Sequence, residues 1–131
     1  MSHARYLVLS ALLTWVMLLT ASLLRSRGWS LAGLRVAFGN RDDLDEPTPL
    51  AARADRAAKN MLENLLLFVA VSVAVAVRGT AAPANVALGS AIFFYARVAY
   101  FFVYLAGIAY LRTAIWAVAL VGVGIVGAAA F

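Results

Sequence analysis

The chain lacks cysteine, has one histidine and three prolines in 131 residues, and carries charge on only 13% of them. Without cysteine it can form no disulfide and no cysteine-ligated zinc site. His3 is a lone terminal histidine with no partner at ligand spacing, so we predict no metal site. The basic residues flank apolar runs instead of gathering on one polar face, and we therefore expect no nucleic-acid partner.

Hydrophobic residues dominate the composition of the chain. They make up 65% of the chain, against about 45–50% in ordinary soluble domains, and the mean hydropathy is +0.91. The uncharged runs from Tyr6 to Leu24 and from Thr113 to Phe131 would each be about 28 Å long as helices, close to the thickness of a bilayer's hydrocarbon core. The net charge of +5 suits anionic headgroups. The composition predicts a membrane protein, with membrane lipid among its partners.

Two further apolar segments lie between these runs. Together the four predict an all-α integral membrane protein, a four-transmembrane-helix bundle in a single domain, 1–131. We expect helices at about 5–25, 49–78, 83–106 and 112–131, with a polar loop at 26–48. Thr48 followed by Pro49 is typical of an N-cap and a first helical residue, which predicts where the second helix begins.

The distribution of basic residues predicts the orientation of the four helices. One side of the membrane holds only Arg5 and Arg78. The first loop and the start of the second helix hold the larger set: Arg25, Arg27, Arg35, Arg41, Arg53, Arg56 and Lys59. The positive-inside rule therefore predicts a cytoplasmic first loop and termini on the non-cytoplasmic side.

Polar residues also form two helical stripes inside the apolar segments. The first stripe steps by three or four residues through Arg53, Arg56, Asn60 and Glu63. The second runs through Arg97, Tyr100 and Tyr104, and Arg112 stands at the turn where it ends. We predict that the two stripes form a pocket at the cytoplasmic side, suited to an anionic ligand held beside a hydrophobic small molecule.

Glu63 and Arg97 are expected at the same depth. Each lies about five residues, or ~7–8 Å, inside the hydrocarbon core when the helices are measured from their far ends. Because an unpaired charge in a bilayer is costly, we expect the two side chains to form an ion pair. A brace of this kind can also be purely structural.

The residues of both stripes carry a family resemblance. R-A-x-x-N-x-x-E, read as Arg56, Ala57, Asn60 and Glu63, resembles the signature of the MAPEG family, the membrane-associated proteins in eicosanoid and glutathione metabolism. A-R-V-A-Y-F-F-V-Y, residues 96–104, is similar to the R-x-x-Y-x-x-x-Y segment of that family's leukotriene-forming synthases. The chain length, the four spans and the expected position of the termini match as well.

The resemblance implies a homotrimer that binds glutathione, as a co-substrate, between neighbouring subunits. It further implies that an arginine beyond the second tyrosine, here Arg112, stabilises the glutathione thiolate and is the catalytic residue. The glutathione contacts that it implies are Arg53, Arg56, Asn60, Glu63, Arg97, Tyr100 and Tyr104. The function expected from it is a glutathione-dependent membrane transferase or peroxidase acting on a lipophilic electrophile.

Three positions depart from the family pattern. Ala58 stands where family enzymes usually carry His or Gln, and Asn64 replaces an aromatic residue. Arg112 follows Tyr104 by eight residues, one more than in the leukotriene-forming branch. Ala58 and the displaced Arg112 favour an alternative, a non-catalytic lipid-binding or scaffolding membrane subunit. A small exporter that uses Glu63 as its membrane carboxylate is a third hypothesis.

The last apolar segment contains G-V-G-I-V-G, Gly122 to Gly127. It matches the G-x-G-x-x-G pattern of nucleotide-binding loops, but no strand precedes it and it lies inside a membrane span. We interpret these glycines, with Ala128, as a surface for close packing against a neighbouring helix.

Overall fold

The computed structural model describes residues 2–42, 44–78 and 84–131, and all the regular structure in these ranges is helical. The helices are α1 (His3–Ser26), α2 (Leu31–Phe38), α3 (Pro49–Val77), α4 (Ala84–Ala106) and α5 (Ala109–Ala128). All except α2 are long and apolar enough to cross a membrane. The predicted fold class, an all-α bundle with four membrane spans, is confirmed.

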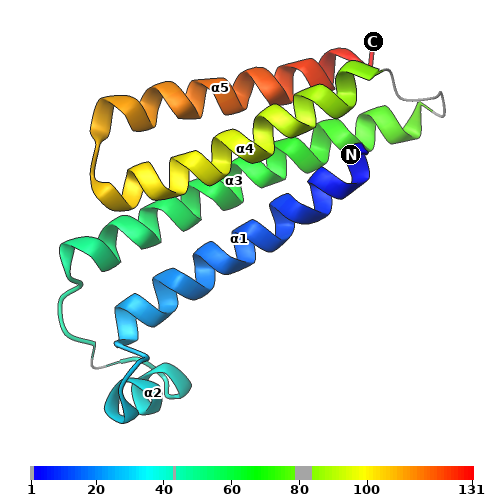
Figure 1. The fold of residues 1–131 in the computed structure, drawn as a ribbon. Coiled ribbons are helices and arrows are strands. Elements are labelled where there is room, and N and C mark those ends of the chain that lie inside the picture. The colour runs from blue at the N-terminus through cyan, green and yellow to red at the C-terminus, as the bar shows by residue number, and fades with distance from the viewer. Residues whose placement is uncertain (1, 43, 79–83) are drawn as a thin grey trace.

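The four long helices lie side by side in one bundle (Figure 1). α4 and α5 form the most extensive pair, while α1 packs on α3 and α4, and α3 contacts both α4 and α5. The two chain ends lie at one end of the bundle, and the start of α3 and the α4–α5 turn lie at the other end (Figure 1). The polar stripes of α3 and α4 are thereby carried to the same end as the first turn of α5.

The interior is built from large apolar side chains on neighbouring helices. Phe68 of α3 stacks on Phe93 of α4 with ring centroids 4.3 Å apart, and Met17 and Met61 are fully buried beside them. Much of the outer surface is apolar as well, as the 62% exposure of Trp15 on α1 illustrates. An apolar exterior is what a lipid environment requires of helices that span it.

Glycines bring α4 and α5 into close contact. A Cβ on Gly122 would lie 2.6 Å from the carbonyl oxygen of Gly89, and a Cβ on Gly127 would lie 3.4 Å from Val71 of α3. Gly124 has open space around its Cα. The predicted close-packing surface is therefore present, but Gly122 and Gly127 face helices of the same chain.

Within the predicted polar loop 26–48 the structure contains a helix that the sequence analysis did not anticipate. α2 begins where the side chain of Ser30 accepts a hydrogen bond from the amide of Gly33, at 2.9 Å. A Cβ on Gly33 would overlap the carbonyl group of Arg27, so glycine is what allows α2 to pack on the end of α1. The segment is too short for its periodicity to stand out among surrounding polar residues.

The ends of the long helices follow local sequence signals. α3 begins with Pro49 in its first turn, and the hydroxyl of Thr48 accepts a hydrogen bond from Ala51 N at 3.2 Å, as the N-cap prediction requires. α4 ends at Ala106, and the next residue, Gly107, has a φ of 80° that is accessible to glycine at little cost. The turn is short, and α5 begins at Ala109, three residues earlier than expected.

Candidate functional site

An open pocket of about 380 Å³ lies between α3, α4 and the first turns of α5. Its position is the one expected for the two polar stripes, at the end of the bundle that holds the start of α3. The residues that line it are Arg56, Lys59, Asn60, Glu63, Tyr100, Tyr104, Arg112, Thr113 and Trp116.

The charges of this pocket favour an anion that also carries a positive group. Arg56, Lys59 and Arg112 supply three cations, and Glu63 supplies the one carboxylate of the lining. The ion pair found among the described residues joins Lys59 Nζ to Asp55 at 2.8 Å, and both of these side chains are largely exposed. Arg56 and Glu63, also exposed, can therefore meet a ligand without breaking an internal pair.

Arg112 lies in the first turn of α5, where its amide donates to the carbonyl oxygen of Ile108 at 3.1 Å. Its guanidinium carbon is 4.6 Å from the centre of the Tyr104 ring. Ile108 provides no side-chain cap, so free amides give the start of α5 a partial positive charge close to Arg112. Arg112 and the start of α5 therefore both favour a negative charge in this part of the pocket.

Two tyrosines line one wall of the pocket, and an arginine packs against each of them. The Tyr100 and Tyr104 rings are 5.4 Å apart and inclined by 70°, and the guanidinium carbon of Arg97 lies 4.2 Å from the centre of the Tyr100 ring. Arg97, Tyr100, Tyr104 and Arg112 thus form a cation–aromatic stack. Both tyrosines are nearly buried, so the stack holds their rings in fixed positions.

Asn60 is oriented by this stack. Arg97 Nη2 donates to Asn60 Oδ1 at 2.9 Å, which leaves the Asn60 amino group free to donate toward the pocket. Arg97 Nε donates to the sulfur of Met61 at 3.2 Å. Asn64 turns back to the carbonyl oxygen of Asn60, at 2.8 Å, and does not line the pocket.

The expected Glu63–Arg97 ion pair is not formed, and that prediction was wrong for the residues described here. Arg97 is fully buried and directed at Asn60, whereas Glu63 is exposed at the mouth of the pocket. Counting residues from the helix ends fixed the height of each side chain. It left open the rotation of each helix about its axis, which decides whether two side chains meet.

Arg53 and Arg97 do not line the pocket, although both were expected among the ligand contacts. Arg53 Nε donates to the carbonyl oxygen of Leu105 at 3.0 Å, and its guanidinium packs beside Gly107. It therefore satisfies a carbonyl at the end of α4. Arg97 lies behind the wall, where it contacts the pocket residues Asn60 and Tyr100. The other six expected residues are brought together.

Three lining residues were missed as site residues: Lys59, Thr113 and Trp116. Lys59 follows Arg56 by three residues and precedes Glu63 by four, so it lies on the same side of the helix, next to Asn60 of the first stripe. Trp116 follows Arg112 by four residues, one helical turn further into α5. Widening the first stripe by one residue and extending the second by one turn would have found these two side chains.

Fold and site together define a class: a multi-pass integral membrane protein, all-helical, with a cationic and aromatic pocket at one end of its bundle. A model of the MAPEG family matches residues 4–131, essentially the whole chain. The chain therefore belongs to the MAPEG family, as its two motifs predicted. Comparisons with curated proteins and with solved structures found no match. Membership makes it a membrane protein of the group concerned with eicosanoid and glutathione metabolism.

Proposed function

We propose that the protein is a glutathione-dependent membrane transferase or peroxidase that acts on a lipophilic electrophile. The observation that supports this most strongly is the convergence of Arg56, Asn60, Glu63 and Arg112 with two tyrosines around one open pocket. Membership of a family concerned with glutathione metabolism points to the same ligand class.

The charges of glutathione correspond to those of the lining. The tripeptide has two carboxylates, one ammonium group and a thiol. Arg56 can bind one carboxylate, Lys59 can bind the other by leaving its exposed pair with Asp55, and Glu63 can bind the ammonium group. The free amino group of Asn60 can donate to a peptide carbonyl or a carboxylate of the ligand. The implied contacts Arg53 and Arg97 act indirectly in this proposal, through the end of α4 and through Asn60.

Arg112 is the group that we assign to the sulfur. A free thiol has a pKa of about 8.5, and a neighbouring cation lowers it, so that more of the ligand is thiolate at neutral pH. The guanidinium stacked on Tyr104 and the start of α5 both favour a negative charge there. The thiol proton leaves to water, and the thiolate forms a bond to the electrophilic atom while the leaving group departs.

The second substrate is proposed to enter from the bilayer. Trp116 offers an apolar wall at the pocket, and the helices around it are exposed to lipid along their outer faces. We further propose that the pocket faces the cytoplasm, with both termini on the other side, because the first loop and the start of α3 carry most of the basic residues.

A homotrimer is part of the proposal. Arg56, Lys59 and Glu63 are exposed in the single chain, so one side of the pocket is open and a neighbouring copy could cover it. The glycine surface contributes less to such an interface than expected, because Gly122 and Gly127 pack within the chain.

The alternative is a lipid-binding or scaffolding subunit without catalysis. Ala58 favours it, since this position is buried and apolar and adds no polar group to the pocket. An open apolar groove of about 430 Å³ on α4 and α5, lined by Ala91, Ala99 and Ile115 among others, could hold a lipid chain.

Activity assays separate the two proposals. Protein reconstituted in vesicles should conjugate glutathione to an aryl halide or reduce a fatty-acid hydroperoxide, with Arg78→Ala as a matched control at the other end of the bundle. Activity that survives in Arg78→Ala and is lost in Arg56→Ala supports the proposal of a glutathione-dependent transferase or peroxidase. Binding of glutathione without either activity would favour the subunit.

A further inference from the structure

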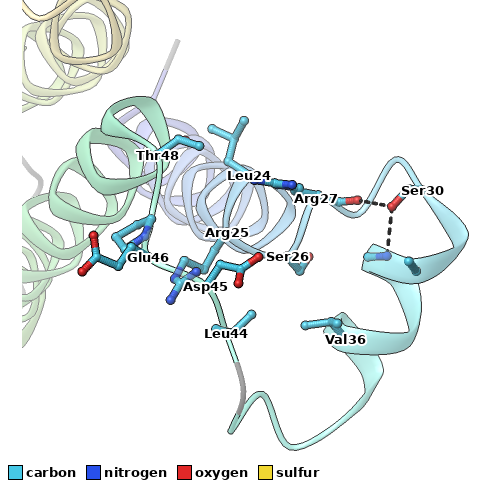
Figure 2. Close-up of a pocket in the computed structure, with 13 residues that line it drawn as sticks. Leu24, Arg25, Ser26, Arg27, Ser30, Val36, Leu44, Asp45, Glu46 and Thr48 are labelled. Atoms are coloured by element: carbon cyan, nitrogen blue, oxygen red, sulfur yellow. Dashed lines mark hydrogen bonds between the residues drawn. The ribbon is translucent and has the colours of Figure 1, made fainter.

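α2 has one face fixed to the protein and one face free. On the inner face, Gly33 touches the backbone of Arg27, and Val36 points into a small cavity at the end of α1 that Leu44 also lines (Figure 2). The dashed lines in Figure 2 mark the bonds by which Ser30 holds the start of α2. Among the described helices, α2 packs against α1.

The outer face is an exposed apolar stripe. Leu31, Leu34 and Phe38 follow one another at three and four residues, so they share one side of the helix. Leu31 is 80% exposed and Phe38 89%, and Trp29, just before the helix, is 71% exposed. Apolar side chains in such a stripe are costly in water, and in a membrane protein the bilayer is an available partner.

The position of α2 brings it to the lipid headgroups. α1 has 24 residues and is therefore about 36 Å long, slightly more than the ~30 Å hydrocarbon core. Its last residue, Ser26, comes to lie at the headgroup level, and α2 follows after a short turn. Figure 1 shows α2 just beyond the end of α1, at the end of the bundle that holds the start of α3.

The charge of this segment matches an anionic surface. Residues 27–41 contain Arg27, Arg35 and Arg41 and no acidic residue. Arg35 lies on the exposed side of α2, one turn from Leu31 and close to Phe38, at the edge of the apolar stripe. Arginines beside an apolar stripe are typical of helices that lie in the headgroup region of anionic membranes.

We propose that α2 is an interfacial anchor, with Leu31, Leu34 and Phe38 inserted among the headgroups and Arg35 bound to the phosphates of anionic lipids. Leu23 near the end of α1 and Trp29 between the two helices are exposed as well, so exposed apolar side chains run along the chain from the membrane span into α2, which argues for lipid over a soluble partner. The proposal is independent of the glutathione pocket, and it holds or fails whether or not that pocket binds glutathione.

Because the chain has no cysteine, a single introduced cysteine can carry a fluorescent probe without further changes. The full-length protein would be placed in nanodiscs of phosphatidylglycerol or of phosphatidylcholine, with the probe at Phe38→Cys. Glu46→Cys, at an exposed residue in the segment before α3, is the control. Quenching by a nitroxide on the lipid headgroup and by a water-soluble nitroxide would be compared.

The Phe38→Cys probe should be quenched mainly from the lipid and the Glu46→Cys probe mainly from water. One arginine near an anionic surface favours association by roughly fivefold. Adding Arg35→Gln to the Phe38→Cys variant should therefore lower the ratio of lipid-bound to free α2 by about that factor in phosphatidylglycerol. Quenching of Phe38→Cys from water overturns the proposal. Protection from both quenchers also overturns it, since α2 would then be covered by a second copy or another protein. Equal behaviour in the two lipids contradicts the role of Arg35.

Discussion

Replacing Arg97 by methionine distinguishes a side chain that positions the pocket from one that holds the bundle together. Arg97 is fully buried, donates to Asn60 and to the sulfur of Met61, and stacks on Tyr100. Its Nη1 has no hydrogen-bond partner among the described residues. Methionine keeps the length and apolar character of the stem and removes the guanidinium.

The effect of Arg97→Met on stability should be small because opposing contributions nearly cancel. The variant loses a charge-assisted hydrogen bond of about 1.5–3 kcal/mol and a desolvated cation–π contact of about 2 kcal/mol. The variant is also relieved of the destabilising cost of burying a cation without a carboxylate partner. That cost is on the order of several kcal/mol, and about 1–3 kcal/mol of it comes from the unpaired Nη1. We expect the free energy of unfolding to change by less than about 2 kcal/mol.

The effect on ligand affinity should be larger than the effect on stability. Without Arg97, Asn60 and the Tyr100 ring lose the contacts that fix them, and both must be immobilised when the ligand binds. Ordering one such side chain costs about 0.5–1.5 kcal/mol. The two together correspond to roughly 5- to 150-fold weaker binding of glutathione.

Thermal unfolding in detergent and calorimetric titration with glutathione measure the two quantities separately. Arg78→Met is the control, because it makes the same chemical change far from the pocket. The Arg78 side chain donates a hydrogen bond to the carbonyl oxygen of Ala129. Unchanged affinity in Arg97→Met would refute the positioning role. A loss of more than about 4 kcal/mol of stability would show that Arg97 is mainly a structural brace.

Four further outcomes are expected. Arg112→Ala should leave glutathione affinity nearly intact, remove the thiolate absorbance and slow turnover by roughly 10²–10³-fold in a conjugation assay. A mild effect on the thiolate absorbance and on turnover would contradict the assignment of Arg112 to the sulfur. Gly122→Ala should cost about 1–3 kcal/mol in detergent unfolding, since its Cβ would lie 2.6 Å from a carbonyl oxygen of α4, whereas Gly124→Ala has space and should be close to neutral. Reporter fusions should place residues near Arg41 in the cytoplasm and the chain end after Phe131 outside; a cytoplasmic end would overturn the orientation. In mild detergent the protein should be a trimer, and a monomer that still binds glutathione would argue against a site shared between subunits.

Periodicity and composition were sufficient for the spans and for most of the pocket. Long uncharged runs leave few alternatives to membrane helices, and the i, i+4, i+7 spacing of Arg56, Asn60 and Glu63 places them on one face of any helix. The family motifs then related this face to the tyrosines of α4, and residues from both faces line one pocket.

Partners between helices were harder to predict. The sequence gives the height of Arg97 in the membrane but not the rotation of α4, and so Glu63 was chosen as its partner in place of Asn60. Arg53 was missed as a cap because its acceptor is a backbone carbonyl of α4, at Leu105, and any residue there offers the same group. A contact to a backbone atom therefore cannot be predicted from the pattern of side chains.

The offset of Arg112 shows how a turn can compensate for spacing. Counted along one helix, eight residues after Tyr104 should point away from the seven-residue position by about 100°. Gly107, with positive φ, ends α4 at Ala106, and α5 begins already at Ala109, which brings Arg112 over the Tyr104 ring. The conformation of Gly107 decides this, and it could not be derived from residue counts.

The most direct test of the central claim is an ultraviolet titration of the purified protein with glutathione, with S-methylglutathione as the ligand that cannot form a thiolate. If the pocket binds glutathione and ionises its sulfur, a saturable thiolate absorbance should appear at neutral pH with glutathione alone, and S-methylglutathione should displace it. The absence of glutathione binding at millimolar concentration would contradict the account.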